Sequence, residues 1–304
     1  MTVSSSNEVF LVFGAHIDEE KSGNGWVSGL IQEELSKTGD RYQVSSVRIE
    51  DREAVLRELD RVKPTRVINT AGKRGFPNAD WCEDHKDAAI RSNVIGAANL
   101  VDCCFIRNVH ITHFASACIY DEDESHPLDG PGFTEEEPPN YAASFYSYSK
   151  LVSEQAIKSY PNVLILRLRN PLAADLHPMN FITKLIRYEK IVNVPNSGTI
   201  MTNMTPAAVL LSRHRETGIF NFTNPGTFTH NEVMELTKKF IRPSLSWTNF
   251  SLEEQRKVLK APRTNAKLDA SKLEKTLAKY GYTILGAQDA LEEAFVIMKA
   301  KGYK

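Results

Sequence analysis

Cysteine is scarce in this chain, and its few cysteines form no framework. There are four in 304 residues, and no two of them have the C-x-x-C spacing of a zinc or redox site. The histidines are scattered, without the spacing of metal ligands. A disulfide-stapled scaffold is therefore excluded, no metal is expected, and the reducing cytoplasm is the expected compartment.

An excess of one charge and long apolar runs are lacking too. The 37 basic residues nearly balance the 38 acidic ones, for a formal charge of −1, so we expect no nucleic-acid partner. The first residues are polar, unlike a secretory signal, and no window approaches the roughly 18 to 20 apolar residues of a membrane span. No membrane association is expected. A hydrophobic content of 41% suffices for a sizeable core.

What the chain does have is a regular alternation of apolar and amphipathic segments. Residues 9–13 are continuously apolar and end at Gly14, as is typical of a strand buried on both faces of a parallel sheet. The patterns predict further strands at 42–47, 66–69, 109–115 and 163–168, and helices at 26–37, 51–61, 80–108 and 146–159. This alternation indicates an α/β fold with a doubly wound, Rossmann-like parallel sheet.

The regular alternation of strands and helices ends at about Arg169, after which prolines recur at short intervals. We therefore predict two domains: a dinucleotide-binding domain at residues 1–168 and a smaller, irregular C-terminal substrate-binding lobe at 169–304. Ligands of such sheets bind beyond the carboxyl ends of the strands. The ends of three predicted strands carry Gly14, Gly72 and Ser116.

The strongest chemical signal is a strand-end serine followed by a Tyr-x-x-x-Lys pair. Tyr146 and Lys150 lie one helical turn apart on the same face, where an ammonium lowers the pKa of a phenol from about 10. Ser116 would hold the same substrate oxygen from the other side. A ketone between them is placed for hydride transfer, which indicates an oxidoreductase. A plain surface helix is the alternative interpretation.

The phosphate-binding turn is the weakest part of the pattern. Gly14 ends the first strand, but ten residues separate it from Gly25, Trp26 and Val27, where the helix begins. Backbone N–H groups there would bind the pyrophosphate, together with Ala71 and Gly72 after the third strand. The intervening acids at 18–20 would repel a phosphate, so we expect them to point away. A plain loop with turn glycines is the alternative.

The nicotinamide cofactor is predicted to be NADPH. Arg48 follows the second strand, where the adenosine ribose is read, and an arginine there favours a 2′-phosphate, with Arg52 as a candidate helper. A solvated surface charge is the alternative for Arg48.

A resemblance to a known family covers nearly the whole chain. The stretches that carry it include Asn69-Thr-Ala-Gly72, Pro77-Asn-Ala-Asp-Trp-Cys-Glu83, Ser116-Ala-Cys-Ile-Tyr120, Asn180-Phe-Ile-Thr-Lys184 and Asn221-Phe-Thr-Asn-Pro-Gly226. The chain resembles the extended short-chain dehydrogenase/reductases that act on nucleotide sugars. Within them it is most similar to the bifunctional 3,5-epimerase/4-reductases of UDP-4-keto-6-deoxyglucose. It departs from their pattern at the glycine turn, where two residues normally separate the first glycines and Ser28 replaces a third.

The resemblance implies NADPH, a UDP-linked ketosugar and two activities in one pocket. It carries the epimerase roles onto Cys118 as base and Lys184 as acid, and it suggests Asn180 and Arg263 as contacts of the uracil and the pyrophosphate. A homodimer through the long helices is a family-level expectation. Structural roles are the alternative for each of these residues. A reductase that receives an already epimerised sugar, and a non-catalytic cofactor-binding subunit, are the alternative functions.

Overall fold

The structure is a computed structural model that describes residues 8–18, 21–76 and 78–304. The chain divides into two units. The first, called unit 1, comprises residues 1–115, 145–166 and 208–219, and unit 2 comprises residues 116–144, 167–207 and 220–304. The predicted boundary between residues 168 and 169 stays a prediction, and each unit is described by itself below.

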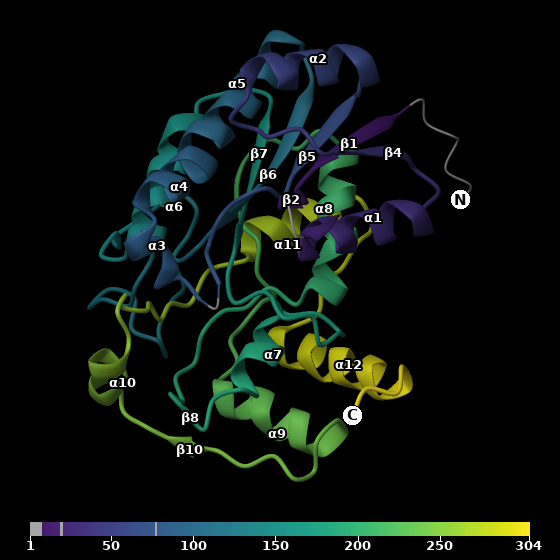
Figure 1. The fold of residues 1–304 in the computed structure, drawn as a ribbon. Coiled ribbons are helices and arrows are strands. Elements are labelled where there is room, and N and C mark those ends of the chain that lie inside the picture. The colour runs from purple at the N-terminus through teal and green to yellow at the C-terminus, as the bar shows by residue number, and fades with distance from the viewer. Residues whose placement is uncertain (1–7, 19–20, 77) are drawn as a thin grey trace. The chain divides into compact units, whose positions relative to one another are not determined.

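Six strands form one sheet in the order β4-β1-β5-β6-β7-β9. β1 pairs in parallel with both β4 and β5, and β5 pairs in parallel with β6. The doubly wound parallel sheet expected from the sequence is thereby confirmed (Figure 1). The order reverses at β1, so the carboxyl ends of β1 and β5 flank the switch point at which such sheets bind ligands. The strands are β1 (Val9–Phe13), β4 (Arg41–Ser45), β5 (Arg66–Asn69), β6 (His110–Ser116), β7 (Val163–Leu168) and β9 (Gly218–Asn221).

Helices cover both faces of the sheet in unit 1 (Figure 1). One face packs against α2 (Arg52–Val62), α5 (Ala97–Ile106) and α6 (Phe145–Ile157). The alternation within β1 explains this, because Leu11 and Phe13 join that cluster, whereas Phe10 and Val12 face the other way. α1 (Trp26–Lys37) lies on the opposite face, where it buries Ile31 and Leu35.

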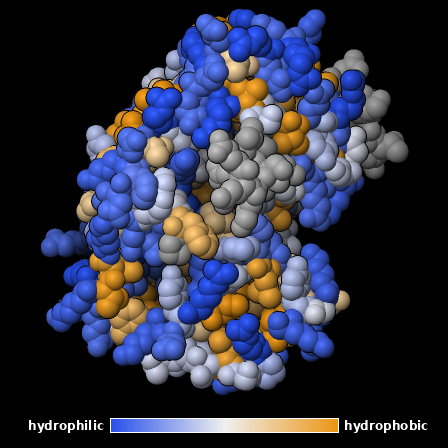
Figure 2. All heavy atoms as spheres, viewed as in Figure 1, coloured by the Kyte–Doolittle hydropathy of each residue, from blue (hydrophilic) through white to orange (hydrophobic). Residues whose placement is uncertain are grey.

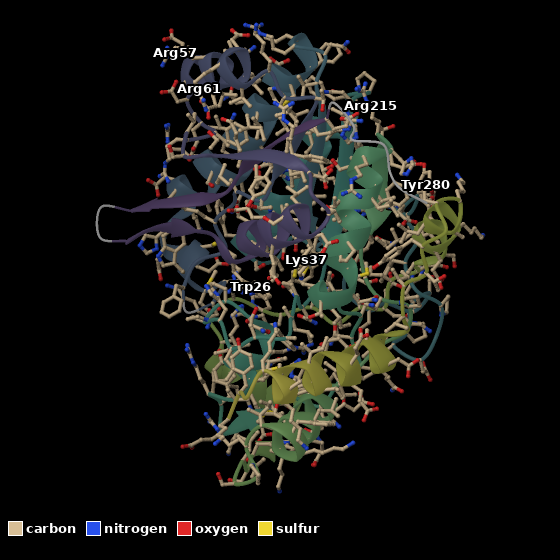
Figure 3. All side chains as sticks on the ribbon, turned by 90° about the vertical axis from the view of Figure 1, so that its right-hand side faces the viewer. Trp26, Lys37, Arg57, Arg61, Arg215 and Tyr280 are labelled. Atoms are coloured by element: carbon tan, nitrogen blue, oxygen red, sulfur yellow. The ribbon has the colours of Figure 1, made fainter. Side chains whose placement is uncertain are left out.

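The outer side of α2 is solvated. Arg57 and Arg61, labelled in Figure 3, pair with Glu53 and Glu58 one turn away on the same helix. Figure 2 shows mainly hydrophilic side chains over α2. Burial of one face only is what gives this helix its strong amphipathic pattern.

The predicted helix at 80–108 is one pattern in the sequence but four segments in the structure. They are α3 (Trp81–Asp84), α4 (Lys86–Ile90), the π-helical turn η1 (Arg91–Gly96) and α5. The wider π turn admits one extra residue, and such turns are frequent at functional sites. Here it turns Asn93 toward the loop after β5, as described below. The other predicted elements of unit 1 agree with the structure to within two residues at either end.

Residues 15–18 and 21–24, between Gly14 and Gly25, form a two-stranded hairpin. Its strands are β2 (Ala15–Asp18) and β3 (Lys21–Asn24), paired antiparallel with Ala15 opposite Asn24. The first and last residues of the hairpin therefore lie side by side. The expectation that its acids point away falls outside what the structure describes, because the side chains of residues 15–24 are not part of that description.

Unit 2 has its own core. α9 (His230–Phe240) and α12 (Ala287–Ala300) pack against α7 (Phe181–Leu185), and their shared cluster includes Ile182, Met234 and Phe295. The remaining elements are β8 (Lys190–Ile191), α8 (Met201–Arg213), β10 (Thr248–Asn249), α10 (Leu252–Val258) and α11 (Ser271–Ala278), with β8 pairing in parallel with β10. The last residues of α8 belong to unit 1.

One expectation about hydropathy needs correction. Within the described residues, the continuous helical stretch 86–106 is long and apolar enough to cross a membrane by length and composition. Half of its most apolar window is buried inside the protein, and Leu100 and Val101 belong to the core of unit 1. The core helix of a folded domain passes the same test, so this is weak grounds for a membrane span.

Candidate active site

The end of β1 and the start of α1 form a tight glycine turn in unit 1. The N–H of Gly25 donates to the carbonyl of Gly14 at 2.9 Å, across the base of the hairpin. A Cβ on Gly25 would lie 2.6 Å from that oxygen. Gly14 has φ of +132°, and a Cβ there would lie 2.0 Å from Oγ1 of Thr70. Both positions therefore require glycine.

This turn opens the N-terminus of α1. Gly25 is the N-cap residue, makes no side-chain cap, and no acidic residue follows in the first turn. Trp26 (labelled in Figure 3) and Val27 are half-buried there. An uncapped helix N-terminus with positive potential suits the pyrophosphate of a dinucleotide, so these residues fit the predicted cofactor. Ser28, in place of a third glycine, is buried and accepts from Nε2 of Gln32 at 3.0 Å.

The loop after β5 is held by two buried asparagines. Oδ1 of Asn69 accepts from the N–H of Ala71 at 3.0 Å. Asn93, from η1, accepts from the N–H of Lys73 and donates to its carbonyl, both at 2.7 Å. Asn93 also donates to Oγ of Ser149 in α6. A Cβ on Gly72 would lie 3.5 Å from Nζ of Lys150, so the loop and the lysine are brought together.

The helix that carries Tyr146 and Lys150 is anchored at its first residue. The N–H of Phe145 donates to Oε1 of Glu83 at 2.7 Å, and a carboxylate at a helix N-terminus is stabilising. The neighbouring Cys82 is fully buried, and burial, with Glu83 second, raises the pKa of its thiol to about 11. Cys82 therefore supports this helix start as a neutral thiol. Lys150 is almost fully buried and Tyr146 is half-buried.

A neutral histidine lies next to the lysine. Nδ2 of Asn69 donates to Nδ1 of His113 at 3.0 Å, an orientation set because Oδ1 of Asn69 already accepts from Ala71. Burial, and then the charge of Lys150, lower the pKa of His113 to about 3. The imidazole thus packs beside the ammonium without adding a second charge.

Acid is therefore expected to destabilise the fold through its buried histidines. The pKa of His113 is lowered to about 3, and those of His110 and His230 to about 4, in each case mainly by burial. The unfolded chain binds these protons near pH 6.5, so stability is lost as the pH falls below that value. Each histidine contributes up to about 1.4 kcal/mol per pH unit until its folded pKa is reached.

The measurement is urea unfolding at pH 6.5, 5.5 and 4.5. The variant His113→Gln should show a shallower loss of unfolding free energy over this range than the wild type, whatever its absolute stability. Equal slopes for the two proteins would contradict the assignment.

Ser116 and Cys118 are brought together within unit 2. Ser116 is buried, and its Oγ accepts from the N–H of Cys118 at 3.2 Å. The N–H of Ala117, between them, donates to the carbonyl of Leu168 at 2.8 Å. A hydroxyl that accepts one bond keeps its own proton to donate to a substrate oxygen. Cys118 is partly exposed, unlike the other three cysteines.

Lys184 and Asn180 share α7. Asn180 is its N-cap: Oδ1 accepts from the N–H of Ile182, and Nδ2 donates to the carbonyls of Ala173 and Asp175. Asn180 has no exposed surface, so these bonds give it a structural role, and contact with uracil remains a prediction. Lys184 is half-buried in the last turn of the helix that Asn180 starts.

The two arginines predicted to bind phosphate differ in their surroundings. Arg263 is half-buried, and its Nη1 donates to the carbonyl of Ala261 at 2.7 Å. Arg48 is exposed near the end of β4, as a group that reads a ribose phosphate should be. Arg52 is instead bound to Asp102 and Asn99, which leaves it unsuited as a helper. Among the residues that the structure describes, no cluster could hold a metal ion.

Sequence reasoning missed three positioning residues. Glu83 fixes the start of α6, and Asn93 fixes the loop after β5. Arg169 donates to the carbonyl of Ala117, the residue before Cys118. Each acts through contacts between segments far apart in the chain, so no local pattern identifies it. Glu83 lay within a stretch that carried the family resemblance, and that was the one available signal.

A glycine turn at a helix N-terminus, a buried lysine one turn after a tyrosine, and a doubly wound sheet are the features expected of an enzyme dependent on a nicotinamide cofactor. Residues 25–198, more than half of the chain, match the NAD dependent epimerase/dehydratase family, and the chain belongs to that family. The resemblance stated from the sequence is thereby confirmed.

Characterised relatives are similar along nearly the whole chain. It is 44% identical over 272 residues to the bifunctional dTDP-4-dehydrorhamnose 3,5-epimerase/dTDP-4-dehydrorhamnose reductase of Arabidopsis thaliana, covering 89% of this chain and 88% of that protein. It is 43% identical to an Arabidopsis trifunctional UDP-glucose 4,6-dehydratase/UDP-4-keto-6-deoxy-D-glucose 3,5-epimerase/UDP-4-keto-L-rhamnose-reductase. That match covers 90% of this chain but only 41% of the longer relative.

Solved structures agree with the fold. The crystal structure of the L780 UDP-rhamnose synthase from Acanthamoeba polyphaga mimivirus superimposes with a TM-score of 0.86 at 31% identity, covering 96% of this chain and 100% of that one. A dTDP-4-dehydrorhamnose reductase from Bacillus anthracis in complex with NADP superimposes with a TM-score of 0.74 at 18% identity, covering 96% and 99%, and shows the shared fold alone.

Proposed function

We propose that this enzyme converts UDP-4-keto-6-deoxy-D-glucose to UDP-β-L-rhamnose, as a 3,5-epimerase and an NADPH-dependent 4-reductase. The observation that carries the proposal is the 44% identity, over nearly the full length of both proteins, to a bifunctional epimerase/reductase. The similarity to a UDP-rhamnose synthase supports the UDP sugar. The Ser116–Cys118 turn and the half-buried Lys184 supply residue types that epimerisation needs.

Epimerisation comes first in this proposal. The C4 ketone makes the hydrogens on C3 and C5 acidic, because each carbanion delocalises onto the C4 oxygen. The Cys118 thiolate takes the proton on one face of the ring, and the Lys184 ammonium returns one on the other. Ser116 and Tyr146 donate hydrogen bonds to the enolate oxygen. Exchange with solvent then restores the protonation states of Cys118 and Lys184.

Reduction follows, because it destroys the ketone on which epimerisation depends. NADPH, held at the Gly14–Gly25 turn and the N-terminus of α1, would supply the hydride that C4 receives. Tyr146 gives its proton to the C4 oxygen, and the buried ammonium of Lys150 favours the phenolate that results. The hydrogen bond from the N–H of Phe145 to Glu83 fixes the start of α6, and with it the position of Tyr146.

Product analysis tests the whole proposal. Purified enzyme is incubated with UDP-4-keto-6-deoxyglucose and NADPH, and the product is identified by NMR. UDP-rhamnose is expected, with deuterium at C3 and C5 when the reaction is run in D₂O. No turnover of this ketosugar, together with reduction of a sugar that is supplied already epimerised, would establish the alternative, a reductase that needs a pre-epimerised UDP- or dTDP-sugar. A parallel incubation with the dTDP-linked ketosugar compares the two nucleotides.

NADPH rather than NADH is proposed because Arg48 is exposed where the adenosine ribose is read. Arg48→Ala should weaken NADPH binding about 10- to 150-fold and leave NADH binding nearly unchanged, since a charged hydrogen bond to phosphate contributes about 1.5–3 kcal/mol. Fluorescence titration with both cofactors measures this. Arg57→Ala, on the solvated side of α2, is the control. An equal loss for both cofactors would contradict the assignment.

We also propose that the enzyme is a homodimer and that it is located in the cytoplasm. The π-helical turn, α5 and α6 of unit 1 expose large apolar side chains, namely Ile95, Phe105, Ile106 and Tyr148. Such side chains support an interface through the long helices. Light scattering of the purified enzyme gives its oligomeric state.

A further inference from the structure

A buried cation lies directly after β7 in unit 2. Arg169 is 2% exposed, and all five of its N–H groups donate to neutral acceptors. Nε and Nη2 bind Oδ1 of Asn196, at 3.2 and 2.7 Å. Nη1 binds Oγ1 of Thr264, and Nη2 binds the Thr264 carbonyl at 2.6 Å. The guanidinium is thus rigidly held.

The remaining bond joins Arg169 to the candidate base. Nη1 donates at 3.1 Å to the carbonyl of Ala117, the peptide that immediately precedes Cys118. The same peptide segment carries the bond from the Cys118 N–H to Ser116 Oγ. Arg169 therefore fixes the Ser116–Cys118 turn and places its positive charge beside it.

No carboxylate neutralises this charge by an ion pair, among the residues that the structure describes. Burial lowers the pKa of Arg169, while the negative forms of Cys118 and then Asp121 raise it. The Oδ1 of Asp121 already accepts from the N–H of Asn265. A buried arginine is costly unless a negative charge compensates it. The Cys118 thiolate is suited to do so.

We propose that Arg169 is the positioning residue that makes Cys118 a base, by holding a fixed positive charge against the Ala117–Cys118 peptide. The inference rests on the proposed function for the role of the thiolate, but the electrostatic pair is testable without it. In the reaction, the C3 or C5 proton moves to sulfur, its electron pair passes to the C4 oxygen, and the Arg169 charge is unchanged throughout. The cation favours the thiolate before each proton transfer.

The test is the pH dependence of Cys118 alkylation by iodoacetamide, read by peptide mapping. The other cysteines are buried, and Cys118→Ser identifies the reactive site. The wild-type profile is the reference against which the variants of Arg169 are compared.

Two substitutions then separate charge from structure. Arg169→Met removes the charge and should raise the inflection by about one pH unit or more, whereas Arg169→Lys keeps the charge and should stay close to the wild type. Arg167→Met is the matched control: it removes an equally buried arginine two residues earlier, in β7, whose guanidinium lies over the Tyr120 ring at 5.2 Å. Equal shifts in the two Arg169 variants, or as large a shift in Arg167→Met, would contradict the proposal.

Solvent deuterium exchange into the ketosugar distinguishes this inference from the proposed function. The pH profile of exchange should move with the alkylation inflection in Arg169→Met. If Arg169→Met shifts the alkylation profile but the wild-type enzyme exchanges no deuterium, the epimerase proposal fails and the Arg169–Cys118 pair stands. If the wild-type enzyme exchanges fully and Arg169→Met leaves the alkylation profile unchanged, the pair fails and the epimerase proposal stands.

Discussion

Tyr146→Phe is expected to lower the rate of NADPH oxidation by a factor of about 10² to 10⁴, the usual contribution of a positioned proton donor. The substitution removes one oxygen and keeps the ring, so α6 and its anchor at Glu83 should be undisturbed. NADPH affinity should therefore change less than threefold. The readout is the fall in absorbance at 340 nm when a nucleotide ketosugar is added.

Tyr148→Phe supplies the matched control for this loss. Tyr148 lies two residues along the same helix, is 45% exposed and faces away from Lys150. It should retain the wild-type rate. An undiminished rate in Tyr146→Phe would mean that the proton reaches C4 from another group, and the redox half of the proposal would then fail.

Cys118→Ala is expected to abolish deuterium exchange at C3 and C5 while leaving NADPH binding intact. Loss of the thiolate removes the proposed base, and no other cysteine can replace it because Cys82, Cys103 and Cys104 are buried. The loss should be about 10²- to 10⁴-fold, the usual contribution of a positioned base. The measurement is NMR of the ketosugar in D₂O.

Two controls make this result specific. Cys103→Ala removes a buried thiol of α5 and should leave exchange unchanged. A ketosugar that is already epimerised should still be reduced by Cys118→Ala, because Tyr146 and Lys150 remain. Full exchange by Cys118→Ala would overturn the assignment of the base.

The fold was predictable because its signals are local. The apolar run at 9–13, the helix at 26–37 and the strands at 66–69 and 163–168 have the predicted bounds, since each is set by periodicity and by a glycine or proline nearby. The helix at 80–108 was not resolved into its parts. The π turn positions Asn93 to accept a hydrogen bond from the N–H of Lys73. Because Lys73 lies twenty residues earlier, no local pattern shows this contact.

The site was predictable only where its residues are close in the chain. Tyr146 with Lys150 could be read from spacing, and the family resemblance added Cys118, two residues after Ser116. The structure brings each pair together within its own unit. Arg169 could not, because its carbonyl partner on Ala117 is 52 residues away. The resemblance to a family identified Lys184 and Asn180, but only the structure shows that Asn180 begins the helix that carries Lys184.

The hairpin between Gly14 and Gly25 has a consequence for how such proteins are recognised. Its two ends touch, so the insertion lengthens the chain without separating the two glycines in space. A pattern written as residue spacing would overlook this turn, and the family match indeed starts at residue 25, where the excursion closes, and omits the first strand. An insertion whose two ends are in contact therefore shortens the stretch of sequence that a spacing pattern matches, while the glycine turn of the folded protein stays intact.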